Sequence, residues 1–505
     1  MMLGSRSAHR MLRQRCQRQA DIAWQTRRTL KQPAFDYRHI RDNAASVQAN
    51  AERRNVRDAR AHRVAQLYDE FCALTAAAND KRSRLNSASR ELAASKSESK
   101  SGPGSEAMKR QARALREAVR DADAAVAQVQ AALEREAARL PNSTHGATPE
   151  GDESQARVVR THGTLHTIDR VPEDGVDQRH LSQKPFADHA DLAARLGLVD
   201  LAAGAAVAGA RFHYWRGAGA LLELALVQYA MTRAVGAGFV PHVTPDVARA
   251  SVVAACGFRP REDTTSGSNG GNGSACQTYR VEHESHAASS SDDPLCLVAT
   301  AEIPLVAMHA GSVVDGARLP MSLAGVSHCF RAEAGARGRD TRGVYRVHQF
   351  TKVELVTLAH PDRSDHELTR LVDFQASLYA DLGLTFRVLL MPTHELGAAA
   401  FQKFDIEAWM PGRRRWGEIS SASNCTDYQA RRLHIRARIG NTAAAGSGSG
   451  SSSPVFVHTL NATAAAVPRL VVAILESFQR PDGTVVVPPV LRPWMMGIDV
   501  LEPPS

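Results

Sequence analysis

Charged and aromatic side chains alternate along one β-type stretch near the middle of the chain. Arg331 and Glu333 come at the end of a first run, and a return run extends from Tyr345 to Glu354. Alternate residues of a strand share a face, so this face is predicted to carry Arg346, His348, Phe350, Lys352 and Glu354. A guanidinium such as that of Arg331 offers forked donors to carboxylate and phosphate oxygens. The pattern therefore indicates a site that orients anions, although a solvated charged hairpin would show the same alternation.

This stretch resembles the second signature motif of class II aminoacyl-tRNA synthetases, in the form found in seryl-tRNA synthetases. The resemblance recurs at residues 300–305 (TAEIPL) and at residues 417–432 (GEISSASNCTDYQARR), in the family's order. It extends from about residue 50 to the C-terminus. Three further segments are most similar to the animal mitochondrial branch of the family: residues 151–154, 458–463 and 467–469.

The resemblance implies ATP-dependent ligation of L-serine to tRNA(Ser) through seryl-adenylate. A carboxylate attacks the α-phosphate of ATP, so catalysis is mainly positioning and charge neutralisation. The resemblance implies that Arg331 bridges the carboxylate and the α-phosphate. It also implies that Glu333 contacts the adenine amino group, that Phe350 stacks on the adenine, and that Arg346 and Arg469 hold the β- and γ-phosphates.

The resemblance implies Mg²⁺ as well, held by Glu418 and Ser421 on a strand with an irregularity. Oxygen ligands suit this ion, which usually keeps several waters.

The family's serine site maps onto Arg331, at the substrate carboxylate, and onto four further residues. Glu354 and Thr300 are expected at the ammonium group with Glu302 beside them, and Thr463 is expected at the substrate hydroxyl. A buried carboxylate is tolerable when it pairs with a substrate cation, and a site built around a hydroxyl rejects alanine. Many relatives have Gly where this chain has Ala462 and Pro468, but the hydroxyl and the arginine that follow are present.

Two rival interpretations stay open on the sequence. One is a catalytically silent synthetase-like protein that binds RNA or a partner, which the intact set Arg331, Glu354, Glu418 and Arg469 argues against. The other is a class II synthetase for threonine or proline, which the serine-type segment after Glu418 argues against.

Two long helices are predicted ahead of this catalytic region, with matching apolar seams and a Gly/Pro breaker at residues 101–104. The first seam is Val64, Leu67, Phe71, Leu74, Ala78, Leu85, Ala88 and Leu92, and the second is Leu115, Val119, Ala122, Val126, Val129, Leu133, Ala137 and Leu140. At about 45 residues each they form an antiparallel coiled-coil arm roughly 70 Å long. Arginines outside the seams are Arg60, Arg63, Arg82, Arg84, Arg113, Arg116 and Arg120. They fit a merely solvated coiled coil, and the resemblance implies that they contact tRNA phosphates.

A helix over residues 218–235 and a short β-type run at 238–243, followed by Pro245, resemble the first class II motif. In the family these elements form the interface of a homodimer. The expected fold is therefore α+β: a class II synthetase antiparallel sheet flanked by helices, with an N-terminal antiparallel coiled-coil arm. The expected domains are a mitochondrial transit peptide at 1–35, a tRNA-binding arm at 36–150 and a catalytic domain at 151–505.

Composition fits this organisation. The chain has 505 residues, 43% of them hydrophobic, which is enough for two or three domains, and its net charge of +9 favours a polyanionic partner. Seven cysteines without a C-x-x-C pair argue against a disulfide scaffold and a structural zinc site. No apolar run approaches the roughly 18 residues of a membrane helix, so no membrane association is expected. The Gly/Ser-rich segments 264–274 and 440–453 are predicted to be flexible loops.

The first 35 residues are rich in arginine and contain Asp21 as their only acid. This composition is typical of a mitochondrial transit peptide, and the alternative is a disordered basic tail that contacts RNA. Together with the mitochondrial resemblance, it predicts a protein of the mitochondrial matrix.

Overall fold

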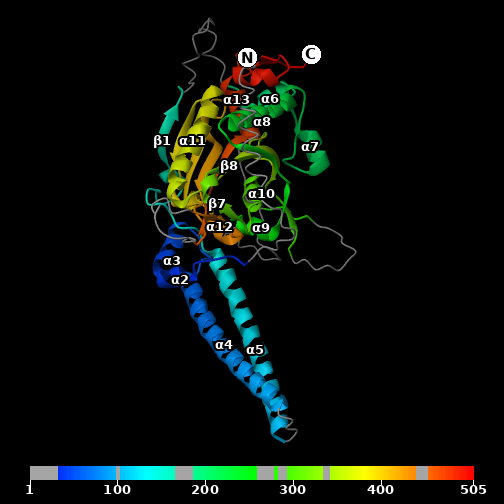
Figure 1. Cartoon of the computed structure of the whole chain (residues 1–505). Helices are drawn as coiled ribbons and strands as arrows, with labels where there is room; N and C mark the ends of the chain where they lie inside the picture. Colours follow the sequence, from blue (N-terminus) through cyan, green and yellow to red (C-terminus); the bar gives the residue numbers. More distant parts are fainter. Residues whose placement is uncertain are drawn as a thin grey trace, which may run out of the picture. The chain divides into compact units, whose positions relative to one another are not determined.

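The computed structural model of the protein describes residues 32–97, 103–164, 186–258, 278–281, 293–333, 342–439 and 453–504. The chain divides into two compact units, one of which is Ala34–Ser143, and the other contains Thr144–Ser505 (Figure 1). Residues 1–31 of the expected transit peptide lie outside the described residues, as do the Gly/Ser-rich segment 264–274 and nearly all of 440–453.

The first unit is built on two long helices, α4 (Ala61–Ser97) and α5 (Pro103–Arg139), which pack against each other (Figure 1). Each has 37 residues, so the expected 45 was too long, and each spans about 55 Å. Pro103 begins α5, because a proline lacks only an N–H that the first helical turn leaves unpaired anyway. Two short helices ahead of the pair, α2 (Tyr37–Asp42) and α3 (Ala44–Arg53), were not predicted.

The predicted seams are confirmed, and their side chains are most deeply buried at one end of the helix pair. Val64, Leu67, Leu133 and Ala137 are buried there in a cluster that also takes in side chains of α2 and α3. Towards the other end most seam residues are only half-buried, and the seven predicted arginines are all exposed. One of them, Arg82, reaches across the pair to Asp123, with 2.6 Å between guanidinium nitrogen and carboxylate oxygen.

The second unit is organised around an eight-stranded sheet with the order β1-β10-β11-β12-β15-β9-β8-β4. Its strands are β1 (Arg157–His162), β4 (Val240–Val243), β8 (Met321–Phe330), β9 (Gln349–Ala359), β10 (Phe386–Leu390), β11 (Gln402–Met410), β12 (Arg415–Asn424) and β15 (His458–Ala466). Neighbouring strands pair antiparallel except β4 with β8. With helices on its faces (Figure 1), this sheet confirms the expected fold class.

Alternation along β9 separates two apolar cores. Val353 and Leu355 belong to the first core, with α8 (Ala218–Gly236), α11 (Ser364–Asp381) and α13 (Val467–Ser477). Val356 and Leu358 belong to the second, with α9 (Ala250–Ala255), α10 (Glu302–Ala307) and α12 (Tyr428–Leu433). Lys352 and Glu354 have the same parity as the second set and so lie on its face of the sheet. Phe350 has that parity too, but its ring, near the start of the strand, packs against the first core.

Short elements connect these parts. The helices among them are α6 (His189–Arg195) and α7 (Leu201–Ala208), and the strands are β2 (Val199–Asp200), β3 (Tyr214–Trp215), β5 (Val247–Arg249), β6 (Leu295–Leu297), β7 (Val313–Asp315), β13 (Arg436–Arg438), β14 (Val455–Phe456), β16 (Val485–Val486) and β17 (Val500–Leu501). Within the part of the chain that the structure describes, no helix combines the length and apolarity that crossing a membrane requires.

Candidate active site

The charged hairpin differs in one respect from its prediction. The return strand β9 begins at Gln349 and not at Tyr345, so Arg346 and His348 do not lie on it. Val344 and Tyr345 are both buried in the first core. Adjacent residues of a strand face opposite ways, so two neighbours that enter one core require a turn in the chain.

Phe350, Lys352 and Glu354 do share a face of β9. The ammonium group of Lys352 forms an ion pair with the carboxylate of Glu354, and both side chains are buried. The guanidinium carbon of Arg331, which follows β8, lies 5.2 Å from the centre of the Phe350 ring, a cation–π contact. The solvated-hairpin alternative is therefore wrong for this part of the stretch, because its charges are paired in a dry environment.

Thr463 lies directly opposite Glu354 on the neighbouring strand β15. Its hydroxyl donates a hydrogen bond to Glu354 Oε2 over 3.2 Å. The pairing brings together two residues that are 109 positions apart in the chain. One carboxylate oxygen thus receives both a hydroxyl donor and the Lys352 cation.

Glu302 begins α10 and is buried beside this pair. Its Oε1 accepts hydrogen bonds from the side-chain amides of Gln429 at 2.7 Å and Asn461 at 2.9 Å, and its backbone N–H donates to the Thr300 hydroxyl. Burial, reinforced by the negative charge of Glu354, raises the pKa of Glu302 to about 7. The site therefore holds a carboxyl group that a cationic ligand would ionise.

Glu418 and Ser421 lie on β12 on either side of the predicted irregularity. Ile406 of β11 pairs with Ser420 and the next residue, Glu407, pairs with Glu418, so Ile419 is an extra, unpaired residue. Such a bulge reverses the alternation, so two residues three positions apart can face the same side. Both are half-buried, while Ile419 and Ser420 between them are buried.

Arg469, near the start of α13, is paired with Glu418 over 3.1 Å. Burial by itself would raise the pKa of Glu418, but the charges of Arg469, Lys403 and Arg331 outweigh it and hold the pKa at about 2. Glu418 is therefore ionised throughout the physiological pH range, which is the form in which a carboxylate binds a cation.

Tyr345 connects these groups. Its hydroxyl donates to the backbone oxygen of Glu418 at 3.1 Å. The guanidinium carbons of Arg413 and Arg469 lie 4.2 Å and 5.1 Å from the centre of its ring. Arg346, the next residue, reaches Glu333 with 3.5 Å between nitrogen and oxygen.

The predicted site residues thus fall into contacting sets on one region of the sheet. Glu302, Thr300, Glu354 and Thr463 form one set, Glu418 and Arg469 a second, and Glu333 and Arg346 a third. The charge of Arg331 lowers the pKa of both Glu302 and Glu418, so it acts on the first two sets.

Sequence reasoning did not assign site roles to Lys352, Gln429 and Asn461. Lys352 could have been found, because it precedes Glu354 by two residues on the face already singled out. Gln429 lies on α12 and Asn461 on β15, and only the tertiary structure brings their amides to Glu302.

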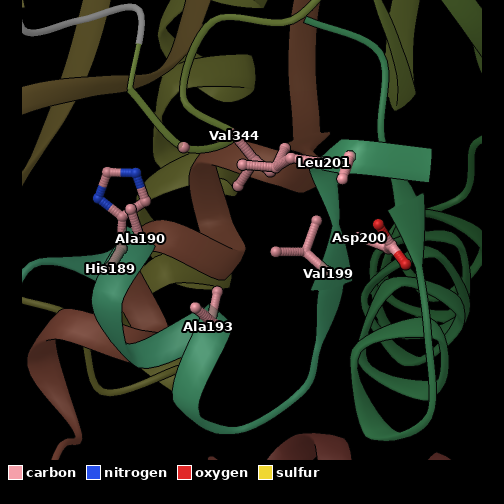
Figure 2. A pocket seen from close by; sticks show the side chains of 10 residues that line it. His189, Ala190, Ala193, Val199, Asp200, Leu201 and Val344 are labelled. Carbon is pink, nitrogen blue, oxygen red and sulfur yellow. The ribbon is translucent and has the colours of Figure 1, made fainter. Parts of the chain in front are cut away.

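A cavity of about 220 Å³ lies elsewhere in the same unit and contains none of the predicted site residues. It is lined mostly by alanine and aliphatic side chains of α6, β2, α7 and the turn at Val344, together with His189 (Figure 2).

Comparison with known proteins gives matches along nearly the whole chain. The family model for the seryl-tRNA synthetase N-terminal domain matches residues 35–144, and the one for the tRNA synthetase class II core domain (G, H, P, S and T) matches residues 279–478. The serine–tRNA ligase of Rhodopirellula baltica is 38% identical over 474 residues, covering 93% of this chain and 99% of the relative.

Two further similarities bear on location and on ligands. The mitochondrial serine–tRNA ligase of Mus musculus is 39% identical over 380 residues, 75% of this chain and 65% of the relative. A crystal structure of the seryl-tRNA synthetase from Pyrococcus horikoshii complexed with ATP superposes with a TM-score of 0.77 at 32% identity, covering 93% of this chain and all of the other.

Proposed function

This chain belongs to the class II seryl-tRNA synthetases, and from that premise we propose how its residues carry out the reaction. The protein is a serine–tRNA ligase, which joins serine to tRNA. We assign the intermediate as seryl-adenylate, made from L-serine and ATP, and the acceptor as tRNA(Ser). The observation that carries the site assignment is the buried contact of Glu354 with Thr463 beside the carboxyl group of Glu302.

Serine matches this set of side chains through two of its polar groups, the ammonium and the hydroxyl. The ammonium group binds Glu302 and Glu354 next to Thr300, and the hydroxyl group binds Thr463. Thr463 already donates to Glu354, and a substrate hydroxyl would add a hydrogen bond to Thr463 that alanine cannot form. Lys352 also pairs with Glu354, so this carboxylate has a cationic partner on the same strand besides the hydroxyl of Thr463.

Arg331 bridges the serine carboxylate and the α-phosphate of ATP. Its guanidinium lies over the Phe350 ring and its charge acts on both Glu302 and Glu418, which supports this role. Phe350 stacks on the adenine and Glu333 accepts from the adenine amino group. Arg346 and Arg469 neutralise the β- and γ-phosphates, so that the pyrophosphate can leave.

The residues present fit a magnesium ion. The bulge at Ile419 turns Glu418 and Ser421 to one side, and Glu418 is held ionised, which suits a hard oxygen-seeking cation. When bound there, Mg²⁺ would neutralise phosphate charge. Arg469 takes one oxygen of Glu418, so its other oxygen and the Ser421 hydroxyl remain for an ion.

We assign the domains as expected from the sequence: a transit peptide at 1–35, a tRNA-binding arm at 36–150 and a catalytic domain at 151–505. The exposed arginines of α4 and α5 support phosphate contacts by the arm.

A homodimer is proposed through α8 and β4. Leu224 on α8 is 61% exposed and Val243 on β4 is 93% exposed, although both are large apolar residues. β4 is also an edge strand, with unpaired backbone groups that a partner could cover.

We place the protein in the mitochondrial matrix and in the animal mitochondrial branch of the family. The arginine-rich N-terminal composition and the similarity to the mouse mitochondrial ligase support this placement. Bacterial relatives are about equally similar, so import into isolated mitochondria followed by sequencing of the mature N-terminus is the deciding experiment.

Exchange of radioactive pyrophosphate into ATP tests the amino acid. We expect exchange with serine and none above background with threonine or alanine, because threonine adds a methyl group among buried side chains and alanine lacks the hydroxyl that would bind Thr463. Exchange with threonine or alanine at rates near that of serine would contradict the assigned pocket.

The pKa of Glu302 predicts how serine binding depends on pH. Its pKa in the folded, empty site is about 7, above the ordinary value of 4.5. The contribution of this group to stability is therefore present below pH 4.5 and is lost as the pH rises through 7. An ammonium ligand stabilises the ionised form, so we expect the KM for serine to fall roughly tenfold between about pH 6 and pH 8.

The matched variant is Glu302→Gln, which keeps the size of the side chain but cannot ionise. We expect its KM for serine to be higher and flat across the same pH range. An equal pH dependence in both proteins would assign the titration to another group.

A further inference from the structure

His189 and Glu476 form a buried pair outside the groups assigned above. Their side chains are 2% and 0% exposed. His189 Nδ1 lies 3.0 Å from Glu476 Oε1, and since a carboxylate can only accept, Nδ1 carries the proton. Glu476 also accepts from the backbone N–H groups of His189 at 3.3 Å and Arg413 at 3.0 Å.

The hydrogen bonds of His189 and Glu476 hold α6 and the backbone at Arg413 to α13, and the group is not a cation site. Asp188, His189 and Glu476 could offer ligand atoms within 4.8 Å of one another. Both oxygens of Glu476 already face N–H donors, however, and Asp188 Oδ1 accepts from the backbone N–H of Ala190 at 2.8 Å. Donors directed at both oxygens of Glu476 and at Asp188 Oδ1 indicate hydrogen bonding within the protein.

The ring of His189 lies against the turn that leads into Tyr345. Gly343 has φ +72°, and a Cβ added there would lie 2.4 Å from His189 Nε2. Nε2 itself has no hydrogen-bond partner among the residues that the structure describes. The ring edge is therefore in packing contact with the backbone of the turn. Val344 and His189 line the same cavity (Figure 2). The turn is therefore not packed on all sides there, and the His189 ring supplies the packing contact at Gly343.

The same pair is connected to the arginine at the other end of α13. Glu476 follows Arg469 by seven residues, or about two turns, so both lie on one side of the helix. Glu476 accepts from the backbone N–H of Arg413, whose guanidinium lies over the ring of Tyr345. Tyr345 in turn contacts Arg469.

We propose that His189 and Glu476 are positioning residues for ATP. They fix the position of the turn at residues 343–345 relative to α13, so that Arg346, which follows the turn, and Arg469, on the helix, bind the same phosphates. This inference rests on the proposed assignment of those two arginines to the β- and γ-phosphates. It predicts an effect on ATP that is not shared by serine, whose pocket is built from β9, β15 and α10.

The first test is His189→Asn in the full-length protein. An asparagine amide keeps a donor for Glu476 but lacks the ring edge against Gly343. We expect the KM for ATP in pyrophosphate exchange to rise by roughly tenfold or more, since misplacing a binding group by about 1 Å can cost that much. The KM for serine should change by less than about twofold, with dimer content and Tm close to those of the unmodified protein.

The matched control is His309→Asn. His309 is also 2% exposed, and neither of its ring nitrogens has a hydrogen-bond partner in the described part of the chain. It contacts no group assigned to ATP, so its variant should leave both KM values unchanged. Glu476→Gln replaces one oxygen of a carboxylate that accepts from three N–H groups by an NH₂ donor, so it should reproduce the ATP effect of His189→Asn.

A steric complementation gives the second test. Gly343→Ala introduces a methyl group against Nε2, and His189→Ala removes the ring. If the contact operates as proposed, the combined loss in kcat/KM for ATP will be smaller than the product of the two single losses.

Multiplicative losses, equal changes in the KM values for ATP and serine, or a lower Tm with unchanged KM values would each overturn the proposal. Absence of serine-dependent exchange in the unmodified protein would instead overturn the site assignment, and this inference with it.

Discussion

Arg331→Ala is expected to slow serine-dependent pyrophosphate exchange by at least about a hundredfold. A preorganised donor at a developing charge is typically worth about 3 kcal/mol or more, and each 1.4 kcal/mol is about a factor of ten in rate. Arg331 is the residue assigned to bridge the two reacting anions, and its charge acts on both Glu302 and Glu418. The loss should appear in kcat, because the bridge strengthens as the carboxylate attacks the phosphate.

Arg160→Ala is the matched control in the same unit. Arg160 is an exposed arginine on β1 that pairs with Asp373 over 2.5 Å. Surface pairs contribute about 0 to 1 kcal/mol to stability, so exchange should be unaffected. A near-normal rate for Arg331→Ala, in a sample with an unchanged Tm, would show that the motif has been misassigned.

Shortening the arm should separate tRNA charging from amino-acid activation. We would replace residues 75–126 with a short Gly/Ser linker. The cut keeps the buried cluster around Val64, Leu67, Leu133 and Ala137, so the remaining helix ends should still pack. It removes five of the seven predicted arginines, namely Arg82, Arg84, Arg113, Arg116 and Arg120.

No residue assigned to ATP or serine lies in that segment, so pyrophosphate exchange should stay within about twofold of normal. The kcat/KM for tRNA(Ser) should fall by at least roughly tenfold, because phosphate contacts fix the register of the nucleic acid. In the full-length protein, replacing Arg84, Arg113 and Arg120 with alanine should reduce the salt dependence of tRNA binding by about one unit of slope per lost contact.

Alanine at Glu117 and Asp121 is the control on the same helix, since both side chains are exposed and acidic. It should leave tRNA affinity unchanged or raise it. Normal charging by the shortened protein would make the distal arm a solvated spacer.

Much of the site could be predicted because its residues are close in sequence. Phe350, Lys352 and Glu354 share a face of β9 through simple alternation, and the apolar seams of α4 and α5 follow from helical periodicity. The bulge in β12 was also predicted, because the spacing of Glu418 and Ser421 requires one if both are to face the same side.

The misses occurred where the local pattern competed with tertiary packing. In the sequence, the alternation typical of a strand continues back to Tyr345. In the structure, Val344 and Tyr345 are both buried in one core, so the chain bends there and β9 begins only at Gln349. Helices α2 and α3 are only six and ten residues long, too short for periodicity to show, and their apolar side chains are buried against α4 and α5.

The sequence by itself determined the motifs, the helix pair and the chemical types of the groups in the site. Which groups meet was decided by the tertiary structure. The contacts of Glu302 with Gln429, of Glu354 with Thr463 and of His189 with Glu476 join residues 127, 109 and 287 positions apart. Local propensities extend over a few residues, whereas contacts at such separations exist only after strand register and helix packing have brought the segments together.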